Sequence, residues 1–225
     1  MRRNVSLEEI SDGRLYGDHD MVKADCGGCK GCSDCCRGMG DSILLDPFDL
    51  YRMATGLKIR PEELIGEKVA FGVVDGYILP HLNMDRDGEQ CAFLNEEGRC
   101  GIHPFRPGIC RLFPLGRFYE NGSYFYFLQI HECTRPHSKV KVSKWIDTPD
   151  GVAYRKFVTE WHYFLNQVEE QLKQMDEQQR NGLNVHLLKI FYLMPYDENR
   201  DFYEQFAERK EQFLCIHPLK SQEAL

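Results

Sequence analysis

Nine of the ten cysteines in this chain of 225 residues lie between residues 26 and 133. Five of them fall in the string CGGCKGCSDCC, and the other four follow at wider spacing. Thiols three residues apart in a tight turn can reach one metal centre, and zinc sites and iron–sulfur clusters both use C-x2-C pairs for this reason. The sequence therefore predicts metal binding through nine thiols: Cys26, Cys29, Cys32, Cys35, Cys36, Cys91, Cys100, Cys110 and Cys133.

Disulfide bonding is the other common use of many cysteines, and it belongs to oxidising compartments. The first residues, MRRNVSLEE, have a basic start but no apolar segment after it. We therefore expect no signal peptide, a cytoplasmic location and thiols that bind metal rather than one another. Cys215 stands alone near the end of the chain, and we expect it to be a small buried residue without a metal.

The adjacent pair Cys35–Cys36 bears on the number of metal centres. Adjacent side chains in an extended or turn segment diverge, so one thiol is expected to serve a first centre while the other serves a second centre or none. Eight thiolates suffice for two four-cysteine centres, and the alternative is one four-cysteine cluster with structural or reactive thiols beside it. Thiolate ligation suits both zinc and an iron–sulfur cluster, of which we favour the cluster.

Buried thiolates need positive charge nearby. His103 lies between Cys100 and Cys110 and is a candidate ligand, although a role without metal contact is favoured. His131 is expected to support a neighbouring ligand or to lie in the core. Five arginines close to cysteines either supply positive charge to the thiolates or belong to a solvated surface: Arg37, Arg99, Arg106, Arg111 and Arg135.

The string CKGCSDCC, the later string CAFLNEEGRCGIHPFRPGICRLFP and Cys133 together resemble the YkgJ-type CxxCxxCC family, a zinc- or iron-chelating domain with eight cysteines. The resemblance covers roughly residues 26–135 and implies a metal centre. A related branch contains flagellin lysine N-methylases, which implies S-adenosylmethionine and protein lysine substrates. The chain departs from the family pattern at Cys26, which is an extra thiol, at Ala92, where proline is usual, and at His103, where an aromatic residue is common.

Composition excludes several other classes of protein. The chain is 42% hydrophobic with a net charge of −7, and its mean hydropathy is −0.49, which is typical of a globular protein rather than a disordered one. Its apolar runs are far shorter than the roughly 20 residues that span a bilayer. No basic stripe is present, so we expect neither a nucleic acid nor a membrane as partner. Nucleotide and serine-hydrolase motifs are also missing.

Turn and capping residues predict the elements of the first 140 residues. Residues 1–25 are expected to form an edge strand or an arm. Asp46-Pro47 begins a helix that Gly56 ends, and Pro61 begins a second, shorter one. Two hairpins are expected, at Val69–Val74 with Tyr77–Leu82 and at Leu115–Tyr119 with Tyr124–Ile130.

Apolar residues at helical spacing dominate after residue 140. They predict a helix at Ala153–Met175, a break at Asn181-Gly182, and two further helices at Leu183–Met194 and Phe202–Leu214. The predicted fold class is α+β, with a cysteine-rich metal-binding region at residues 1–140. A helical region at residues 141–225 is expected to pack on it as one unit.

Three functions remain open. The first is a metal-binding protein that carries a cysteine-ligated iron–sulfur or zinc centre. The second, implied by the resemblance, is an S-adenosylmethionine-dependent protein lysine methyltransferase whose cofactor would lie at the aromatic hairpin Tyr119–Phe127. The third is a zinc-stabilised module that binds a protein partner. We favour the first function, because eight cysteines exceed what a domain of this size needs for stability alone.

Overall fold

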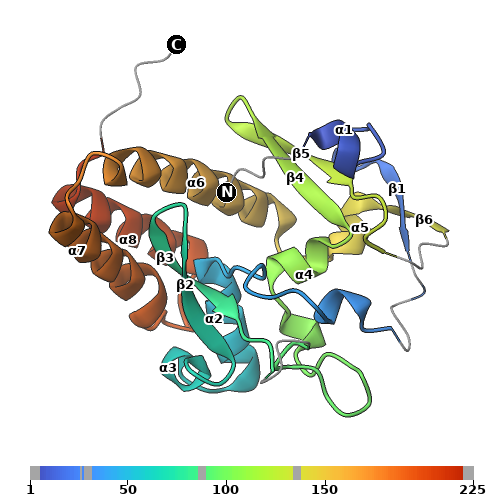
Figure 1. Ribbon diagram of the computed structural model, residues 1–225, viewed down its shortest axis with the longest axis horizontal. Helices are drawn as coiled ribbons and strands as arrows, with labels where there is room; N and C mark the ends of the chain where they lie inside the picture. Colours follow the sequence, from blue (N-terminus) through green and yellow to red (C-terminus); the bar gives the residue numbers. More distant parts are fainter. Residues whose placement is uncertain (1–5, 26, 28–31, 86–89, 134–137, 220–225) are drawn as a thin grey trace.

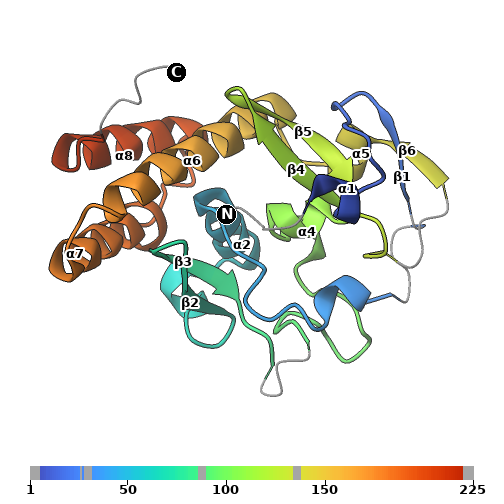
Figure 2. The same ribbon diagram turned by 45° about the horizontal axis from the view of Figure 1, so that its top comes forward.

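Short antiparallel hairpins form the N-terminal half of the computed structural model, and helices form its C-terminal half (Figure 1). The structure describes residues 6–25, 27, 32–85, 90–133 and 138–219. The prediction of an α+β fold is therefore confirmed. Helices α6 (Gly151–Leu172), α7 (Glu177–Leu188) and α8 (Phe202–Ile216) lie together on one side of the molecule (Figures 1 and 2).

Both predicted hairpins are present. Strands β2 (Val69–Val74) and β3 (Tyr77–Leu82) pair around Asp75-Gly76, whose φ angles of 52° and 89° suit a tight two-residue turn. Strands β4 (Leu115–Glu120) and β5 (Ser123–Leu128) pair around the turn residues Asn121 and Gly122. Glycine at the second position of each turn adopts positive φ without a steric penalty.

The N-terminal arm contains one predicted strand and one helix that was not predicted. Strand β1 (Met21–Asp25) pairs antiparallel with β6 (Ser138–Lys141), which confirms the edge strand. The short helix α1 (Leu7–Ile10) comes before it, and the Ser6 side chain caps this helix by accepting a hydrogen bond from the Glu8 amide. Because β1 and β6 are far apart in sequence, their pairing brings the two ends of the cysteine-rich segment together.

Helix α2 (Pro47–Leu57) begins where the capping residue Asp46 predicts, and α3 (Pro61–Leu64) follows it. Gly56 lies inside α2, one residue before its last residue Leu57, so the predicted end is early by one residue. The C-cap is Lys58, which takes a left-handed conformation with φ of 57°. Glycine is required at position 56 for packing, because a Cβ there would lie 2.5 Å from the ring of Phe105.

Three short helices connect the hairpins to the helical half. They are the 3₁₀ turn η2 (His103–Phe105) and the helices α4 (Gly108–Leu112) and α5 (Val142–Ile146). Helix α4 leads directly into β4, and α5 follows β6 without a loop. These connections place the last cysteines of the segment close to the base of the β4–β5 hairpin.

The predicted helix break at Asn181-Gly182 is wrong. The break lies after α6, and α7 begins at Asp176, whose carboxylate accepts a hydrogen bond from the Gln179 amide in a capping box. Gly182 lies inside α7, where a Cβ would meet open space. Glycine in a helix interior costs about 1 kcal/mol, which tertiary packing of the helix offsets. A π-helical turn, η3 (Lys189–Leu193), continues α7.

The two halves share one core. Phe48 of α2 lies 5.0 Å from the ring of Phe202 in α8 and 6.1 Å from Phe157 in α6. Within the helical half, Trp161 of α6 packs edge-on against Phe191 at 5.1 Å. These aromatic contacts join α2, next to the cysteine segments, to α6 and α8, and they join α6 to η3.

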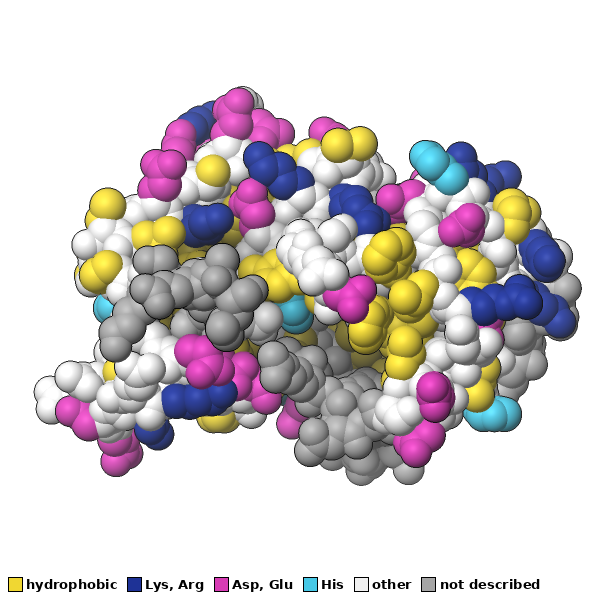
Figure 3. Space-filling model, turned by 90° about the horizontal axis from the view of Figure 1, so that it is seen from above, with side chains coloured by type: hydrophobic (Ala, Val, Ile, Leu, Met, Phe, Trp, Pro, Cys, Tyr) yellow, Lys and Arg dark blue, Asp and Glu magenta, His cyan; other side chains and the backbone are white. Residues whose placement is uncertain are grey.

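One face of the molecule carries side chains of both charges. Acidic and basic groups are interspersed on the face seen in Figure 3, and hydrophobic side chains gather near its centre. None of the helices in the described parts of the chain combines the length and the apolar composition that crossing a membrane requires.

Candidate metal centre

Cysteines from three separate stretches of the chain line one cavity of about 320 Å³. Cys133 is half-buried and does not line this cavity, whereas its neighbour Glu132 does. Cys26 and Cys29 lie outside the described residues. The cysteines that the structure places at the cavity are Cys32, Cys35, Cys36, Cys91, Cys100 and Cys110.

Backbone pairing holds the first two stretches side by side. Cys35 and Cys36 lie on the 3₁₀ turn η1 (Asp34–Cys36), and the Cys91 amide donates a hydrogen bond of 2.8 Å to the Cys36 carbonyl. Leu94 and Cys100 form an antiparallel bridge, which closes a short loop and brings Cys100 back towards Cys91. Figures 1 and 2 show η1 beside this loop in both views.

Cys110 reaches the cavity on the short helix α4. The Asp49 carboxylate of α2 accepts a hydrogen bond of 2.7 Å from the Gly108 amide, at the first residue of α4. Burial raises the pKa of Asp49 to about 6, and the hydrogen bond from Gly108 opposes that rise. Gly108 also packs closely on Tyr154, because a Cβ at this position would lie 2.0 Å from the tyrosine hydroxyl. Asp49 and Tyr154 thus set the position of the Cys110 backbone.

The thiols of Cys35 and Cys36 do not diverge, contrary to the prediction for this pair. Both line the same cavity, and each side chain shifts the pKa of the other. The 3₁₀ turn explains the difference, because its tight winding turns neighbouring side chains less far apart than an extended segment does. The Cys36 side chain lowers the pKa of Cys35 to about 7, while the Cys35 side chain raises the pKa of Cys36.

The buried thiols suppress one another's ionisation. Burial raises the pKa of Cys110 well above its usual value, and the nearby Cys91 and Cys35 raise it further. Burial likewise raises the pKa values of Cys91 and Cys100. Several thiolates in one cavity repel one another, so their deprotonation requires positive charge in the cavity. A metal ion or a cluster supplies that charge.

Of the arginines near the cysteines, Arg106 is best placed to compensate the negative charge of thiolates in the cavity. It lines the cavity and lowers the pKa values of Cys35 and Cys100. Its Nη1 lies 2.7 Å from Nε2 of His103, while its buried Nε has no hydrogen-bond partner among the described residues. A guanidinium with a free buried donor suits an anionic group in the cavity. A metal centre bound by thiolates is such an anionic group.

The other arginines close to the cysteines have different roles. Arg111 is buried and donates hydrogen bonds to the backbone carbonyls of Arg106, Asp147 and Pro104. Arg37 is exposed and donates to Ser33 and Gln90. Arg99 lines the cavity and lowers the pKa of Cys100, and Arg135 lies outside the described residues.

The two histidines near the cysteines are both exposed. His103 lines the cavity, and burial of its ring together with nearby arginines lowers its pKa, so it is neutral at pH 7. His131 is exposed, with φ of 69°, so the expectation of a core position is wrong, while its support of a neighbouring ligand stays a prediction. Cys215 is exposed on α8, which also contradicts its expected burial.

The six cysteines reach the cavity from three directions, from the stretch around η1, from the Cys91–Cys100 loop and from α4. Within the parts of the chain that the structure describes, no three side chains of Cys, His, Asp or Glu are close enough together to hold one metal ion.

The residues that position Cys110 were missed by sequence reasoning. The only local signal for Asp49 is its place three residues after Asp46, as the second acidic residue of a capping box. The structure contains this box, because the Asp49 carboxylate accepts a hydrogen bond from the Asp46 amide. The contact of Asp49 with Gly108 spans 59 residues. No local pattern signals a contact of that separation, nor the packing of Tyr154 against Gly108.

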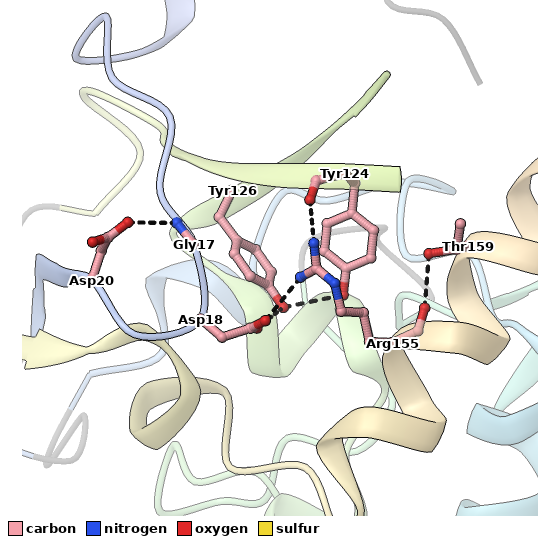
Figure 4. A network of polar contacts seen from close by, with 7 residues as sticks. All are labelled: Gly17, Asp18, Asp20, Tyr124, Tyr126, Arg155 and Thr159. Carbon is pink, nitrogen blue, oxygen red and sulfur yellow. Dashed lines mark hydrogen bonds and ion pairs between the residues drawn. The ribbon is translucent and has the colours of Figure 1, made fainter. Parts of the chain in front are cut away.

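A polar network fixes the N-terminal arm that leads into the cysteine string (Figure 4). Arg155 of α6 donates 3.0 Å to the Asp18 carboxylate and also donates to the Tyr124 carbonyl. Its guanidinium lies 4.1 Å from the centre of the Tyr124 ring. The Tyr126 hydroxyl donates to the other oxygen of Asp18 at 3.2 Å. The arm is thereby joined to both β5 and α6 a few residues before Cys26.

Arg155→Gln is expected to lower the free energy of unfolding by about 1–2 kcal/mol, because a half-buried charged hydrogen bond and a cation–π contact are lost together. Lys156→Gln is the matched control, since Lys156 is exposed on the same helix and its Nζ lies 3.9 Å from Glu160. It should change stability by less than about 0.5 kcal/mol. Urea titration measures both variants, and equal effects would contradict the assigned role of Arg155.

Comparison with known proteins gives one match. Residues 28–135 match the model of the CxxCxxCC family, described as "Putative zinc- or iron-chelating domain". No curated protein and no solved structure matches the chain. The matched segment includes all six cysteines at the cavity, together with Arg106 and the Gly108–Leu112 helix. Residues 28–135 of the chain are therefore similar to the CxxCxxCC family of domains.

Proposed function

We propose that this protein binds a cysteine-ligated metal centre in the cavity between η1, the Cys91–Cys100 loop and α4. The observation that carries the proposal is the convergence of six cysteines from three chain stretches on one cavity, beside Arg106. We further propose that Cys29, Cys26 and Cys133 complete the set of thiols, since they adjoin the same stretches in sequence. Sulfur-rich sites select zinc or iron over calcium or magnesium.

We favour an iron–sulfur cluster over a single zinc ion as the centre. One tetrahedral zinc ion takes four thiolates, whereas six thiols line this cavity. A cluster with its four thiolates also fills more of a cavity of about 320 Å³ than one ion does.

The aromatic hairpin supports a structural role rather than a cofactor site. Tyr124 is 1% exposed and Tyr126 is 4% exposed. Their hydroxyls lie 3.1 Å apart, and the Tyr119 ring stacks on His162 of α6 at 3.6 Å. These side chains fill the space between the hairpin and α6, and none of the three lines the cavity of the cysteines. The methyltransferase alternative therefore gains no support from them.

Protein purified without oxygen or chelators is expected to hold iron or zinc at near-stoichiometric amounts. An iron–sulfur cluster predicts several iron atoms per chain, an equal amount of acid-labile sulfide and visible absorption that bleaches on reduction. A single zinc ion predicts about one zinc atom per chain and no sulfide. Elemental analysis with a sulfide assay separates these outcomes. Protein that contains neither metal would contradict the proposal.

A further inference from the structure

We propose that His186 and His217 form a second metal site, for a divalent ion that prefers imidazole, such as Zn²⁺ or Ni²⁺. His186 lies in the last turn of α7, and His217 follows α8 directly. Nδ1 of His186 and Nε2 of His217 lie 2.7 Å apart. Both residues lie outside residues 28–135, so this site is separate from the cysteine centre.

Packing holds both imidazole rings in place. The His186 ring stacks on Phe213 of α8 at 5.5 Å with an interplanar angle of 25°. The His217 ring lies 4.8 Å from the same phenylalanine, which is fully buried. This packing keeps the two rings next to each other, so bringing both ligands to one ion requires only a turn of each ring.

The distance between the two nitrogens is close to the value that chelation needs. Metal–nitrogen bonds to imidazole are about 2.0–2.1 Å long, so two nitrogens lie about 2.9 Å apart in adjacent positions of an octahedron and about 3.3 Å apart on a tetrahedral zinc ion. A widening of about 0.2 Å for octahedral Ni²⁺ or about 0.6 Å for Zn²⁺, together with a turn of the rings that points both lone pairs at the ion, converts the hydrogen-bonded pair into a chelate. Because His186 lies in α7 and His217 follows α8, a bound ion would link α7 to the end of α8.

Both rings are available as ligands at neutral pH. Burial lowers the pKa values of His186 and His217, so both are neutral. In the hydrogen bond one facing nitrogen carries the proton, and on metal binding that ring changes tautomer, moving its proton to the outward nitrogen. No proton is gained or lost overall. The nearby Lys189 also lowers the pKa of His186, and its positive charge limits the affinity for a dication.

The remaining coordination positions are left to water. Among the described residues no third Cys, His, Asp or Glu completes the pair. Two imidazoles with water ligands suit the later first-row metals, whose affinity for nitrogen donors is highest. Binding therefore stabilises the contact of α7 with the end of α8 without making the fold depend on it.

Titration of Ni²⁺ into the metal-loaded, full-length protein tests this site by calorimetry. We expect one Ni²⁺ per chain in the wild type, and at least about tenfold weaker binding in both His186→Asn and His217→Asn. His19→Asn removes an exposed imidazole elsewhere and should bind as the wild type does. Cys215→Ser should also be unchanged. The iron or zinc content of the cysteine centre should be equal in all five proteins.

NMR of histidine-labelled wild-type protein provides a readout that does not depend on the folding of the variants. Ni²⁺ is paramagnetic, so one equivalent should broaden the ring signals of His186 and His217 before those of the other histidines. Three results would overturn the proposal: no nickel binding by the wild type, unchanged binding in both histidine variants, or thiolate-to-nickel absorption that Cys215→Ser removes.

Discussion

Replacing Cys110 with serine is expected to remove the metal centre and to lower the free energy of unfolding by several kcal/mol. Cys110 lines the cavity from α4, and a serine hydroxyl is a poor ligand for zinc or iron. Metal binding contributes directly to folding in such domains, with apparent free energies of about 10–16 kcal/mol for structural zinc. Metal analysis of the purified variant, followed by thermal unfolding, measures the two effects separately.

Cys215→Ser is the matched control for this experiment. Cys215 is exposed on α8, outside the family segment, so metal content and melting temperature should stay within error of the wild type. A Cys110→Ser protein that keeps its full metal content shows that Cys110 is no ligand. Equal metal loss in both variants would show that the proposed set of ligands is wrong.

Gly108→Ala is expected to cost about 1–3 kcal/mol of stability and to reduce the metal content, although no ligand is changed. The added Cβ would lie 2.0 Å from the Tyr154 hydroxyl and 3.5 Å from Oδ1 of Asp49. Tyr154 is buried, so it can move away only by disturbing its neighbours. The hydrogen bond from the Gly108 amide to Asp49 weakens as α4 shifts, and Cys110 moves with it.

Gly182→Ala is the matched substitution at an open position. Nothing lies within 4 Å of its added Cβ inside α7, so it should raise stability by about 0.5–1 kcal/mol. The double variant Gly108→Ala/Tyr154→Phe removes the clashing hydroxyl and should regain part of the lost metal content. Denaturant titration with metal analysis tests all three proteins. A Gly108→Ala protein with unchanged stability and metal content would contradict the close packing of Gly108.

Local sequence signals predicted most of the secondary structure. Asp46-Pro47 begins α2 and Asp75-Gly76 turns the β2–β3 hairpin, as expected. Such signals act between residues about four positions apart, so they can be read without knowledge of the fold. The prediction at Gly182 was wrong because the capping box at Asp176 sets the start of α7. Glycine weakens a helix but does not end it when the surrounding residues pack well.

The sequence by itself determined the class of chemistry. Soft sulfur donors at C-x2-C spacing favour zinc or iron over calcium or magnesium, and ligand type and local spacing are covalent properties of the chain. The glycines and capping residues likewise determined where hairpins and helices form. No contact between distant residues was needed for either conclusion.

Only the tertiary structure decided which groups meet. The Cys36 carbonyl pairs with the Cys91 amide, Asp49 binds Gly108 across 59 residues, and His186 meets His217 across 31. These contacts arise because the aromatic core brings α2, α6 and α8 together, and burial of apolar surface selects that packing without regard to separation in the chain. Hydrophobic packing therefore determines where the thiols lie, although their number and type are determined by the sequence.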